Sequence, residues 1–198
     1  RIVSVSENLK LEKRIAITPE IAKKYIALGH EVSLSENYAE HLGIKDNEFT
    51  QIGATISKDE KEIINSADII VQVSLPIDDK ISLINENQTI VGTLNPHINK
   101  DKINNLTKKN INVFSLELLP RITRAQSMDV LSSQANLAGY KAVIESFANF
   151  EKAIPMMMTA AGTIPAAKVL VVGAGVAGLQ AIATAKRMGA IVFATDVR

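Results

Sequence analysis

Cysteine and tryptophan are absent from the 198-residue sequence, and histidine occurs only three times. Without cysteine there are no disulfides, no thiolate metal ligands and no cysteine nucleophile. The three histidines, His30, His41 and His97, lack the spacing of metal ligands, so we predict no metal site. Aromatic residues make up 4% of the chain, too few for the stacking surfaces that bind single-stranded nucleic acid.

An excess of either charge is also missing. The 22 Lys+Arg and 21 Asp+Glu residues give a formal net charge of +1. Nucleic-acid-binding proteins normally carry a strong basic excess, so we expect no nucleic-acid partner. The best candidate for a membrane span, residues 169–185, contains three glycines and is shorter than the roughly 20 apolar residues required. We therefore expect no direct insertion into a membrane.

Short apolar runs alternate with amphipathic stretches from residue 1 to about residue 120. Runs rich in Ile and Val and bounded by Gly, Asn or Pro predict strands, and the stretches between them predict helices. This alternation is typical of a parallel sheet with helices on both faces. The predicted strands are residues 2–5, 31–34, 54–56, 68–73, 89–92 and 112–115, and the predicted helices are residues 19–28, 47–52, 58–65, 78–84 and 99–109.

One long helix is predicted over residues 132–150, because apolar residues recur there at three- and four-residue steps. At 1.5 Å per residue it would span roughly 30 Å and could connect two domains; an ordinary surface helix is the alternative. We predict an N-terminal α/β domain, residues 1–125, followed by a linking helix and the start of a Rossmann domain, residues 126–198. The predicted fold class is α/β, with two Rossmann-like parallel-sheet domains, the second truncated after its first β-α-β. Because the sequence lacks an initial Met and stops within this second domain, we expect it to be a piece of a longer protein.

A glycine-rich motif follows the apolar run at residues 169–172 and opens an alanine-rich helix, predicted over residues 176–188. The G-x-G-x-x-G spacing in a strand–turn–helix context predicts a dinucleotide site. The first glycine permits a tight turn, the second lets the backbone approach a pyrophosphate, and the third lets helix and strand pack closely. We assign to this site Gly173, Ala174, Gly175, Val176 and Gly178.

A second strand, residues 190–195, ends at Asp196, which lies 18 residues beyond Gly178. A carboxylate here accepts hydrogen bonds from the ribose hydroxyls and repels a 2′-phosphate, so we predict NAD(H) rather than NADP(H). Arg198 would soften that repulsion. We include Asp196, Val197 and Arg198 among the cofactor-binding residues.

A polar segment, residues 120–133, contains two arginines, a glutamine, an aspartate and several hydroxyls. From spacing alone it is interpreted as the capped start of the long helix, with Ser127 or Asp129 as N-cap. A ligand-binding loop is the alternative, since no apolar periodicity explains these polar residues.

Four segments resemble the proton-translocating NAD(P) transhydrogenases, in particular NAD(H)-binding domain I of their alpha subunit. They are residues 121–129 (Arg-Ile-Thr-Arg-Ala-Gln-Ser-Met-Asp), 136–140 (Asn-Leu-Ala-Gly-Tyr), 159–169 and 194–198. The resemblance extends over essentially all 198 residues and is most specific after Pro120. It implies a homodimeric component at the cytoplasmic side of the inner membrane or the mitochondrial matrix side. That component would exchange hydride with NADP(H) on a partner domain, Si/Re-specifically, coupled to proton movement through a membrane domain.

The resemblance also implies site residues. It assigns the catalytic positions to Arg121, Gln126, Asp129 and Ser132, with Gln126 near both nucleotides. Direct hydride transfer requires the two nicotinamides to be held close and water excluded, and it needs no acid, base or metal from this domain. The expected cofactor-binding positions of this segment are Arg121, Ile122, Thr123, Gln126, Ser127, Met128, Asp129 and Ser132.

Alanine dehydrogenase shares this fold and is the main alternative, because residues 13–19 (Lys-Arg-Ile-Ala-Ile-Thr-Pro) resemble both families. That enzyme needs a Lys and a His in its first domain to bind and protonate the amino-acid substrate. Residues 71–76 contain no Lys, and His97 is displaced from the position expected near Asn95. We therefore expect Arg14 to be structural. Because half of the nucleotide site is expected to lie beyond Arg198, we expect these 198 residues alone to be inactive. A non-catalytic NAD-binding module is the second alternative.

Overall fold

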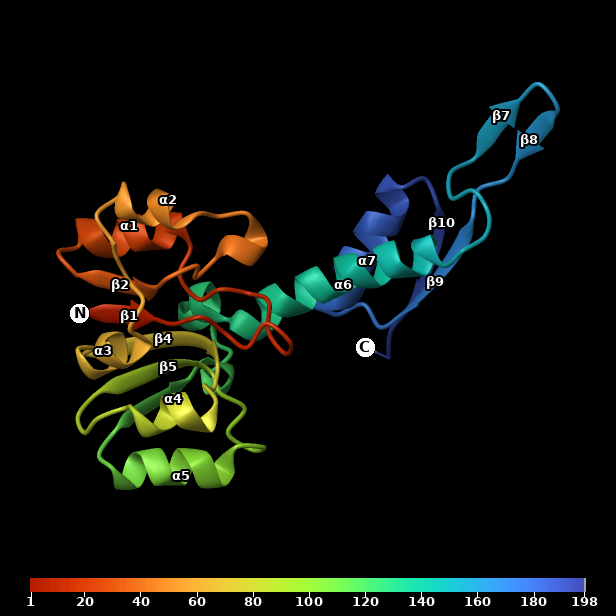
Figure 1. Ribbon diagram of the computed structural model, residues 1–198. Helices are drawn as coiled ribbons and strands as arrows, with labels where there is room; N and C mark the ends of the chain where they lie inside the picture. The colour runs from red at the N-terminus through yellow and green to blue at the C-terminus, as the bar shows by residue number, and fades with distance from the viewer. Residues whose placement is uncertain (198) are drawn as a thin grey trace. The chain divides into compact units, whose positions relative to one another are not determined.

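The computed structural model describes residues 1–197, and the chain divides into two compact units, Arg1–Pro120 and Arg121–Arg198 (Figure 1). The domain boundary predicted at residue 125 lies a few residues beyond this division, within the 3-10 helix η3 (Thr123–Met128).

The first unit contains a six-stranded sheet in which every neighbouring pair of strands is parallel. The strand order β3-β2-β1-β4-β5-β6 is the doubly wound arrangement, in which the winding direction reverses between β1 and β4. All six predicted strands are confirmed to within one residue at each end. They are β1 (Ile2–Ser4), β2 (Val32–Ser35), β3 (Thr55–Ser57), β4 (Ile69–Ser74), β5 (Thr89–Thr93) and β6 (Asn112–Ser115).

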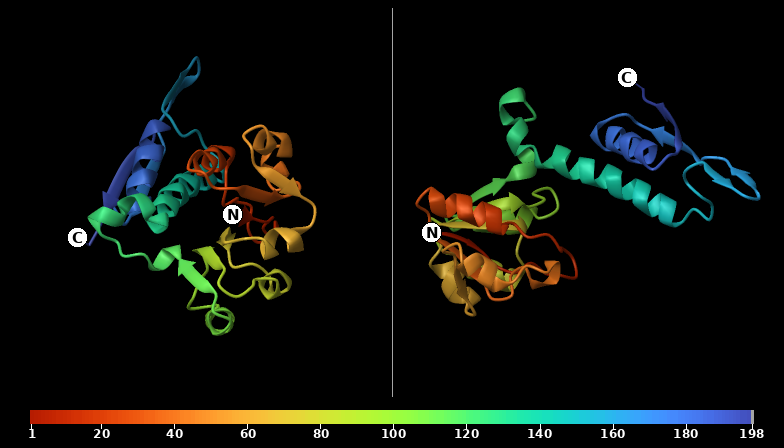
Figure 2. Two further views of the ribbon diagram at one scale, coloured as in Figure 1. Left: turned by 90° about the vertical axis from the view of Figure 1, so that its left-hand side faces the viewer. Right: turned by 90° about the horizontal axis from the view of Figure 1, so that it is seen from above.

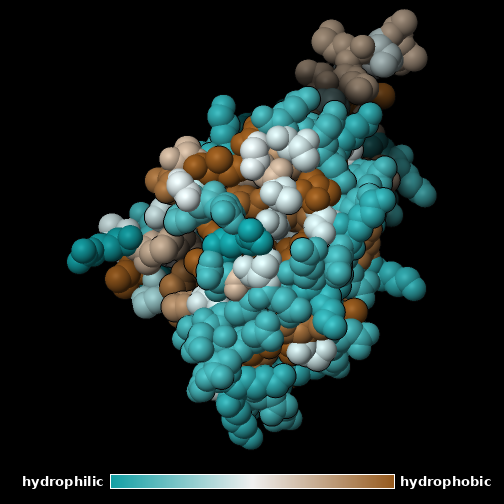
Figure 3. Space-filling view, turned by 60° about the vertical axis from the view of Figure 1, so that its left-hand side comes forward, coloured by the Kyte–Doolittle hydropathy of each residue, from teal (hydrophilic) through white to brown (hydrophobic). Residues whose placement is uncertain are grey.

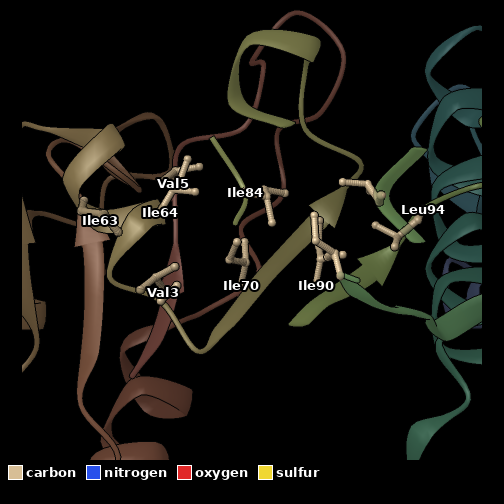
Figure 4. Close-up of a cluster of buried hydrophobic side chains, with 11 residues drawn as sticks. Val3, Val5, Ile63, Ile64, Ile70, Ile84, Ile90 and Leu94 are labelled. Atoms are coloured by element: carbon tan, nitrogen blue, oxygen red, sulfur yellow. The ribbon is translucent and has the colours of Figure 1, made fainter. Parts of the chain in front are cut away.

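Helices cover both faces of this sheet (Figure 2), and successive residues of β1 point to opposite faces. Val3 belongs to a core cluster with α3, α4 and α5 (Figure 4), whereas Ile2 belongs to a cluster with α1 and α2. The side chains on the face shown in Figure 3 are mostly hydrophilic, as expected where the Ile and Val residues fill two inner layers. The helical elements of this unit are α1 (Pro19–Ala27), η1 (Glu40–Leu42), α2 (Asp46–Thr50), α3 (Glu60–Asn65), α4 (Asp78–Ser82), α5 (Lys100–Lys108) and η2 (Leu116–Leu118).

The second unit begins with η3 and a long helix, α6, followed by a hairpin and one β-α-β. Strands β9 and β10 are parallel, and the buried side chains of α6 and α7 pack on them through Val169, Val171 and Val192. The predicted second Rossmann-like sheet is therefore confirmed. Its elements are α6 (Val130–Ala148), β7 (Met157–Thr159), β8 (Gly162–Ile164), β9 (Lys168–Val172), α7 (Val176–Arg187) and β10 (Ile191–Thr195).

The β7–β8 hairpin was not predicted. Its strands have three residues each and all six are exposed, so neither strand has a buried face to produce an alternating pattern. Even α6, with 19 residues, does not meet the requirements of a bilayer span, and neither does any other helix within residues 1–197.

A buried hydrogen-bond network connects β1, β4 and the segment before α1. The Tyr38 hydroxyl accepts hydrogen bonds from the backbone N–H groups of Ala16 (3.0 Å) and Ile17 (3.1 Å). The Ser4 hydroxyl donates to Gln72 Oε1 at 2.8 Å, so Tyr38 donates its own proton to Ser4 Oγ, also at 2.8 Å. Every member of this buried network is thereby satisfied, which fixes the segment carrying Arg14 against the sheet.

Replacing Tyr38 with Phe would leave two backbone donors at Ala16 and Ile17 without their acceptor. We expect Tyr38→Phe to lower the free energy of unfolding by about 2 kcal/mol, measured by urea denaturation. The matched control is Tyr25→Phe, since the half-buried Tyr25 makes no hydroxyl hydrogen bond within residues 1–197; it should cost under about 0.5 kcal/mol. Equal losses in the two variants would contradict this account.

Candidate functional site

The turn between β9 and α7 requires glycine at two positions. Gly173 has φ +98°, in the left-handed region, and its N–H donates to Thr195 O at 2.7 Å. A Cβ added to Gly178 would lie 1.8 Å from Gly173 O, a separation that no side chain can occupy. The first turn of α7 is thus packed directly onto the turn that precedes it.

Among residues 1–197, no side chain caps the N-terminus of α7. Gly175 is the N-cap residue, with φ −73° and ψ −168°, and it has no side chain to accept the first helical N–H groups. Those amides and the helix dipole favour an anion such as a pyrophosphate. The geometry of the turn therefore fits a dinucleotide.

Asp196 lies beside this turn because β10 pairs in parallel with β9, with Thr195 opposite Val172. One of its carboxylate oxygens, Oδ2, accepts a hydrogen bond from Ala174 N at 2.6 Å. The half-buried Asp196 is therefore adjacent to the predicted phosphate turn, as a ribose-binding carboxylate needs to be. Val197 is fully exposed, and Arg198 lies outside the described residues.

Three predicted site residues meet at the N-terminus of α6 and form what we call the Arg121 cluster: Arg121, Asp129 and Ser132. Asp129 is the N-cap residue: Oδ1 accepts from Ser132 N at 2.9 Å and Oδ2 from the Ser132 hydroxyl at 2.7 Å. The guanidinium of Arg121 donates from Nη2 to Ser132 Oγ at 2.9 Å and lies 3.4 Å from Asp129 Oδ2 through Nε. Of the two N-caps predicted, Ser127 and Asp129, the structure selects Asp129.

The hydrogen bonds within the Arg121 cluster favour the carboxylate form of Asp129. The Ser132 hydroxyl, then the Ser132 backbone N–H and then Arg121 lower the pKa of Asp129 below its ordinary value. Because folding lowers the pKa of Asp129, the Arg121 cluster is fully formed at pH values above the ordinary aspartate pKa. It is lost only as the pH falls through the lowered pKa of the folded state.

The remaining predicted residues of this segment are exposed on or next to η3, which is anchored by the buried Ala125. Within residues 1–197 the Gln126 side chain makes no hydrogen bond, to the Arg121 cluster or elsewhere. The structure thus groups Arg121 with Asp129 and Ser132 but does not add Gln126 to them. The exposed residues are Ile122, Thr123, Gln126, Ser127 and Met128.

Gly139, which is buried in the middle of α6, was not among the predicted site residues. A Cβ added there would lie 2.1 Å from the backbone oxygen of Ala177 in α7. An interior glycine costs a helix roughly 0.5–1 kcal/mol relative to alanine, so its presence in an otherwise regular helix was the available signal.

The first unit contains a cleft of about 290 Å³ at the carboxyl ends of β1 and β4, where the strand order reverses. Such switch points are common ligand sites in doubly wound sheets. The lining includes Glu7 and Lys80 but no glycine, so the cleft lacks a phosphate-binding turn. Within residues 1–197, His, Asp and Glu side chains form no group of three or more that could hold a metal ion.

Arg14 and Lys80 beside this cleft are each paired with a glutamate, whereas Glu7 is held by the backbone. Glu12 is paired with Arg14, at 2.6 and 2.9 Å, which lowers the Glu12 pKa. Lys80 Nζ donates to Ser6 O at 2.8 Å and lies 2.9 Å from Glu60. Glu7 accepts from the backbone N–H of Val73 at 2.7 Å, and burial raises the pKa of its carboxyl.

Comparison with known proteins identifies the family. Residues 4–138 match the family described as "Alanine dehydrogenase/PNT, N-terminal domain", and residues 142–198 match its C-terminal domain. The chain belongs to the alanine dehydrogenase/PNT family.

Two relatives lie on the transhydrogenase side of this family. An NAD(P) transhydrogenase alpha-subunit protein of Rhodospirillum rubrum is 49% identical over 192 residues, covering 94% of this chain and 50% of the relative. The crystal structure of a transhydrogenase from Sinorhizobium meliloti is 46% identical, with a TM-score of 0.94, over 100% of this chain and 59% of that one. The chain thus spans about half the length of the curated relatives it matches.

A solved L-alanine dehydrogenase shares the fold. It has a TM-score of 0.84 at 20% sequence identity, over 100% of this chain and 55% of that one. At this identity the likeness is one of architecture alone.

The order of the hydrogen bonds to Asp129 predicts the outcome of a titration. Ser132→Ala should raise the pKa of Asp129 more than Arg121→Gln does, since the Ser132 hydroxyl stabilises the carboxylate most. Carboxyl carbon NMR of the wild type and both variants would measure this. A larger shift in Arg121→Gln would show that the ion pair, not the hydroxyl, controls Asp129.

Proposed function

We propose that this chain is the NAD(H)-binding component of a proton-translocating NAD(P) transhydrogenase and exchanges hydride with NADP(H) held on a partner domain. The main support is that two features suited to a dinucleotide belong to the same unit. The Arg121 cluster lies at the start of α6, the turn suited to a pyrophosphate lies at the start of α7, and these two helices pack together. The similarity to the Rhodospirillum rubrum transhydrogenase subunit supports the same assignment.

The residues present fit NAD(H). The N–H groups at the start of α7 would bind the pyrophosphate, and Asp196 would accept hydrogen bonds from the adenine ribose. The Arg121 cluster would orient the nicotinamide and its ribose, and the exposed Gln126 would contact the second nucleotide. Bound NAD(H) supplies the hydride donor or acceptor at nicotinamide C4. The chain's contribution is orientation and exclusion of water, so neither a proton-transferring side chain nor a metal is required of it.

The proposed assembly follows from the same assignment. Its components are a homodimer of this chain, a domain that binds NADP(H), and a membrane domain that translocates protons. The homodimer would lie peripherally at the cytoplasmic side of the inner membrane or at the mitochondrial matrix side.

An alanine dehydrogenase activity is the second candidate, favoured by the shared family and fold. Such an enzyme must bind a carboxylate and transfer a proton as well as a hydride. In the first unit, Arg14 is already paired with Glu12, and Lys80 is held by Ser6 O and Glu60. Residues 71–76 contain no Lys, and His97 is exposed. These observations favour the transhydrogenase.

The two candidates predict different reactions for the full-length protein. With an NADPH-loaded partner domain it should reduce an NAD analogue, and with NAD and alanine it should give no turnover. Gln126→Asn should slow hydride transfer by up to ~10²-fold, because a misplacement of the reacting nicotinamide by about 1 Å can lower the rate that much. The affinity for NADH should change little. Rapid alanine oxidation without a partner would overturn the proposal in favour of the dehydrogenase.

The Asp196 carboxylate should select NADH over NADPH by repelling a 2′-phosphate. We expect NADH to bind the full-length protein more tightly than NADPH, and Asp196→Ala to narrow the difference, measured by calorimetry. Asp46→Ala, a half-buried carboxylate of the first unit, is a suitable control and should leave the preference unchanged. Equal affinities in the wild type would refute the role of Asp196.

A further inference from the structure

Gly139 brings the backbone of α6 into direct contact with the start of α7. A Cβ built on Gly139 would lie 2.1 Å from Ala177 O, 2.8 Å from Ala177 C and 3.0 Å from Ala177 Cα. All three atoms are backbone atoms, so no side chain can rotate away to make room. Ala177 is the second residue of α7, directly beside the Gly-rich turn.

The two helices run in the same direction from this contact. Val143 and Phe147, which follow Gly139 in α6, pack in one cluster with Ala181 and Ala185, which follow Ala177 in α7. The N-terminal ends of α6 and α7 therefore point the same way, and the loops preceding them lie on the same side of the unit.

The contact also sets how far α6 extends beyond α7. Ser132 precedes Gly139 by seven residues, which is about 10 Å along a helix. Asp129 and Ser132 lie at this extending end of α6 and hold Arg121 there by hydrogen bonds, so the whole Arg121 cluster belongs to that end. The contact between Gly139 and Ala177 consequently determines the distance between the Arg121 cluster and the Gly-rich turn.

We propose that Gly139 is a positioning residue for hydride transfer, whose close contact with the Ala177 carbonyl sets the distance between the nicotinamide-holding Arg121 cluster and the pyrophosphate-binding turn. This inference rests on the proposed function. Gly139 would act through the placement of α6, without touching the nucleotide itself.

A methyl group at residue 139 would force the helices apart. Ordinary contact begins at 3.4 Å, so a separation of 2.1 Å must grow by more than 1 Å. The Gly-rich turn is built within β9 and α7 and would keep its own geometry, whereas the Arg121 cluster would move with α6. Binding of the adenine half of the nucleotide would survive while the nicotinamide is misplaced.

The test compares Gly139→Ala with Ala138→Ser, which adds one heavy atom at the neighbouring exposed position of the same helix. In the full-length protein with an NADPH-loaded partner, Gly139→Ala should slow single-turnover hydride transfer by about 10²-fold. NADH affinity, measured by calorimetry, should change by less than about threefold, since the phosphate contacts remain. Without nucleotide, the amide NMR signals of Arg121 and Ser132 should shift while that of Ala174 stays. Ala138→Ser should match the wild type throughout.

Val143→Leu provides a second variant if Gly139→Ala does not fold. It adds a methylene between the same helices one turn further along and should reproduce the slowed transfer with retained NADH affinity, to a smaller degree. Wild-type transfer in a folded Gly139→Ala protein, or parallel losses of rate and affinity, would overturn the positioning role. An absence of transfer in the wild type would instead refute the proposed function.

Discussion

The arrangement of the second unit depends on one close approach, that of the α6 backbone at Gly139 to the Ala177 carbonyl of α7. Because the helices touch without an intervening side chain, both can pack on the small β9–β10 sheet through Val143, Ala181 and Ala185. Their parallel direction brings two different polar loops to one side. The start of α7 presents helical N–H groups that no side chain within residues 1–197 caps, and the loop before α6 presents the preorganised Arg121 cluster. We propose that together they bind the two ends of a dinucleotide.

The first unit shows that a doubly wound sheet is not by itself a nucleotide site. Its strand order reverses between β1 and β4, and a cleft lies at that point, yet the loop after β1 has no glycine turn. Instead, the Glu7 carboxylate accepts hydrogen bonds from the backbone at the end of β4, and Glu12 and Glu60 neutralise the nearby cations. Arg14 and Lys80 are paired with Glu12 and Glu60, and the half-buried Glu7 adds an acidic group, so the lining of this cleft offers little to an anionic ligand.

Most of the fold could be predicted from the sequence, because the central strands β1 and β2 are buried on both faces and the helices α1 and α3 begin at recognisable caps, Thr18 and Asp59. The long helix was predicted over residues 132–150, two residues later than α6, because its start required knowing that Asp129, and not Ser127, accepts the Ser132 N–H. Its apolar pattern did not identify the buried face, since Leu137 and Tyr140 are exposed while Gly139 and Val143 are buried. The β7–β8 hairpin could not be predicted, since six exposed residues produce no hydrophobic alternation.

The candidate site was only partly predictable. Spacing alone identified the glycine turn and Asp196, because the chemistry of a phosphate turn is local in sequence. The grouping of Arg121 with Asp129 and Ser132 rested on resemblance, since Arg121 and Ser132 are eleven positions apart in the sequence and no periodicity connects them. The contact at Gly139 joins segments 38 residues apart, and only the packed structure reveals it.

We propose that one nucleotide spans the loops before α6 and α7 and leaves the cleft of the first unit empty. An amide NMR map of the full-length protein on addition of NADH tests it directly. The amide signals of Arg121, Ser132, Ala174 and Gly175 should shift together, while those of Glu7 and Ser74 stay unchanged. Shifts concentrated at Glu7 and Ser74, with those of the α6 and α7 loops unmoved, would contradict it.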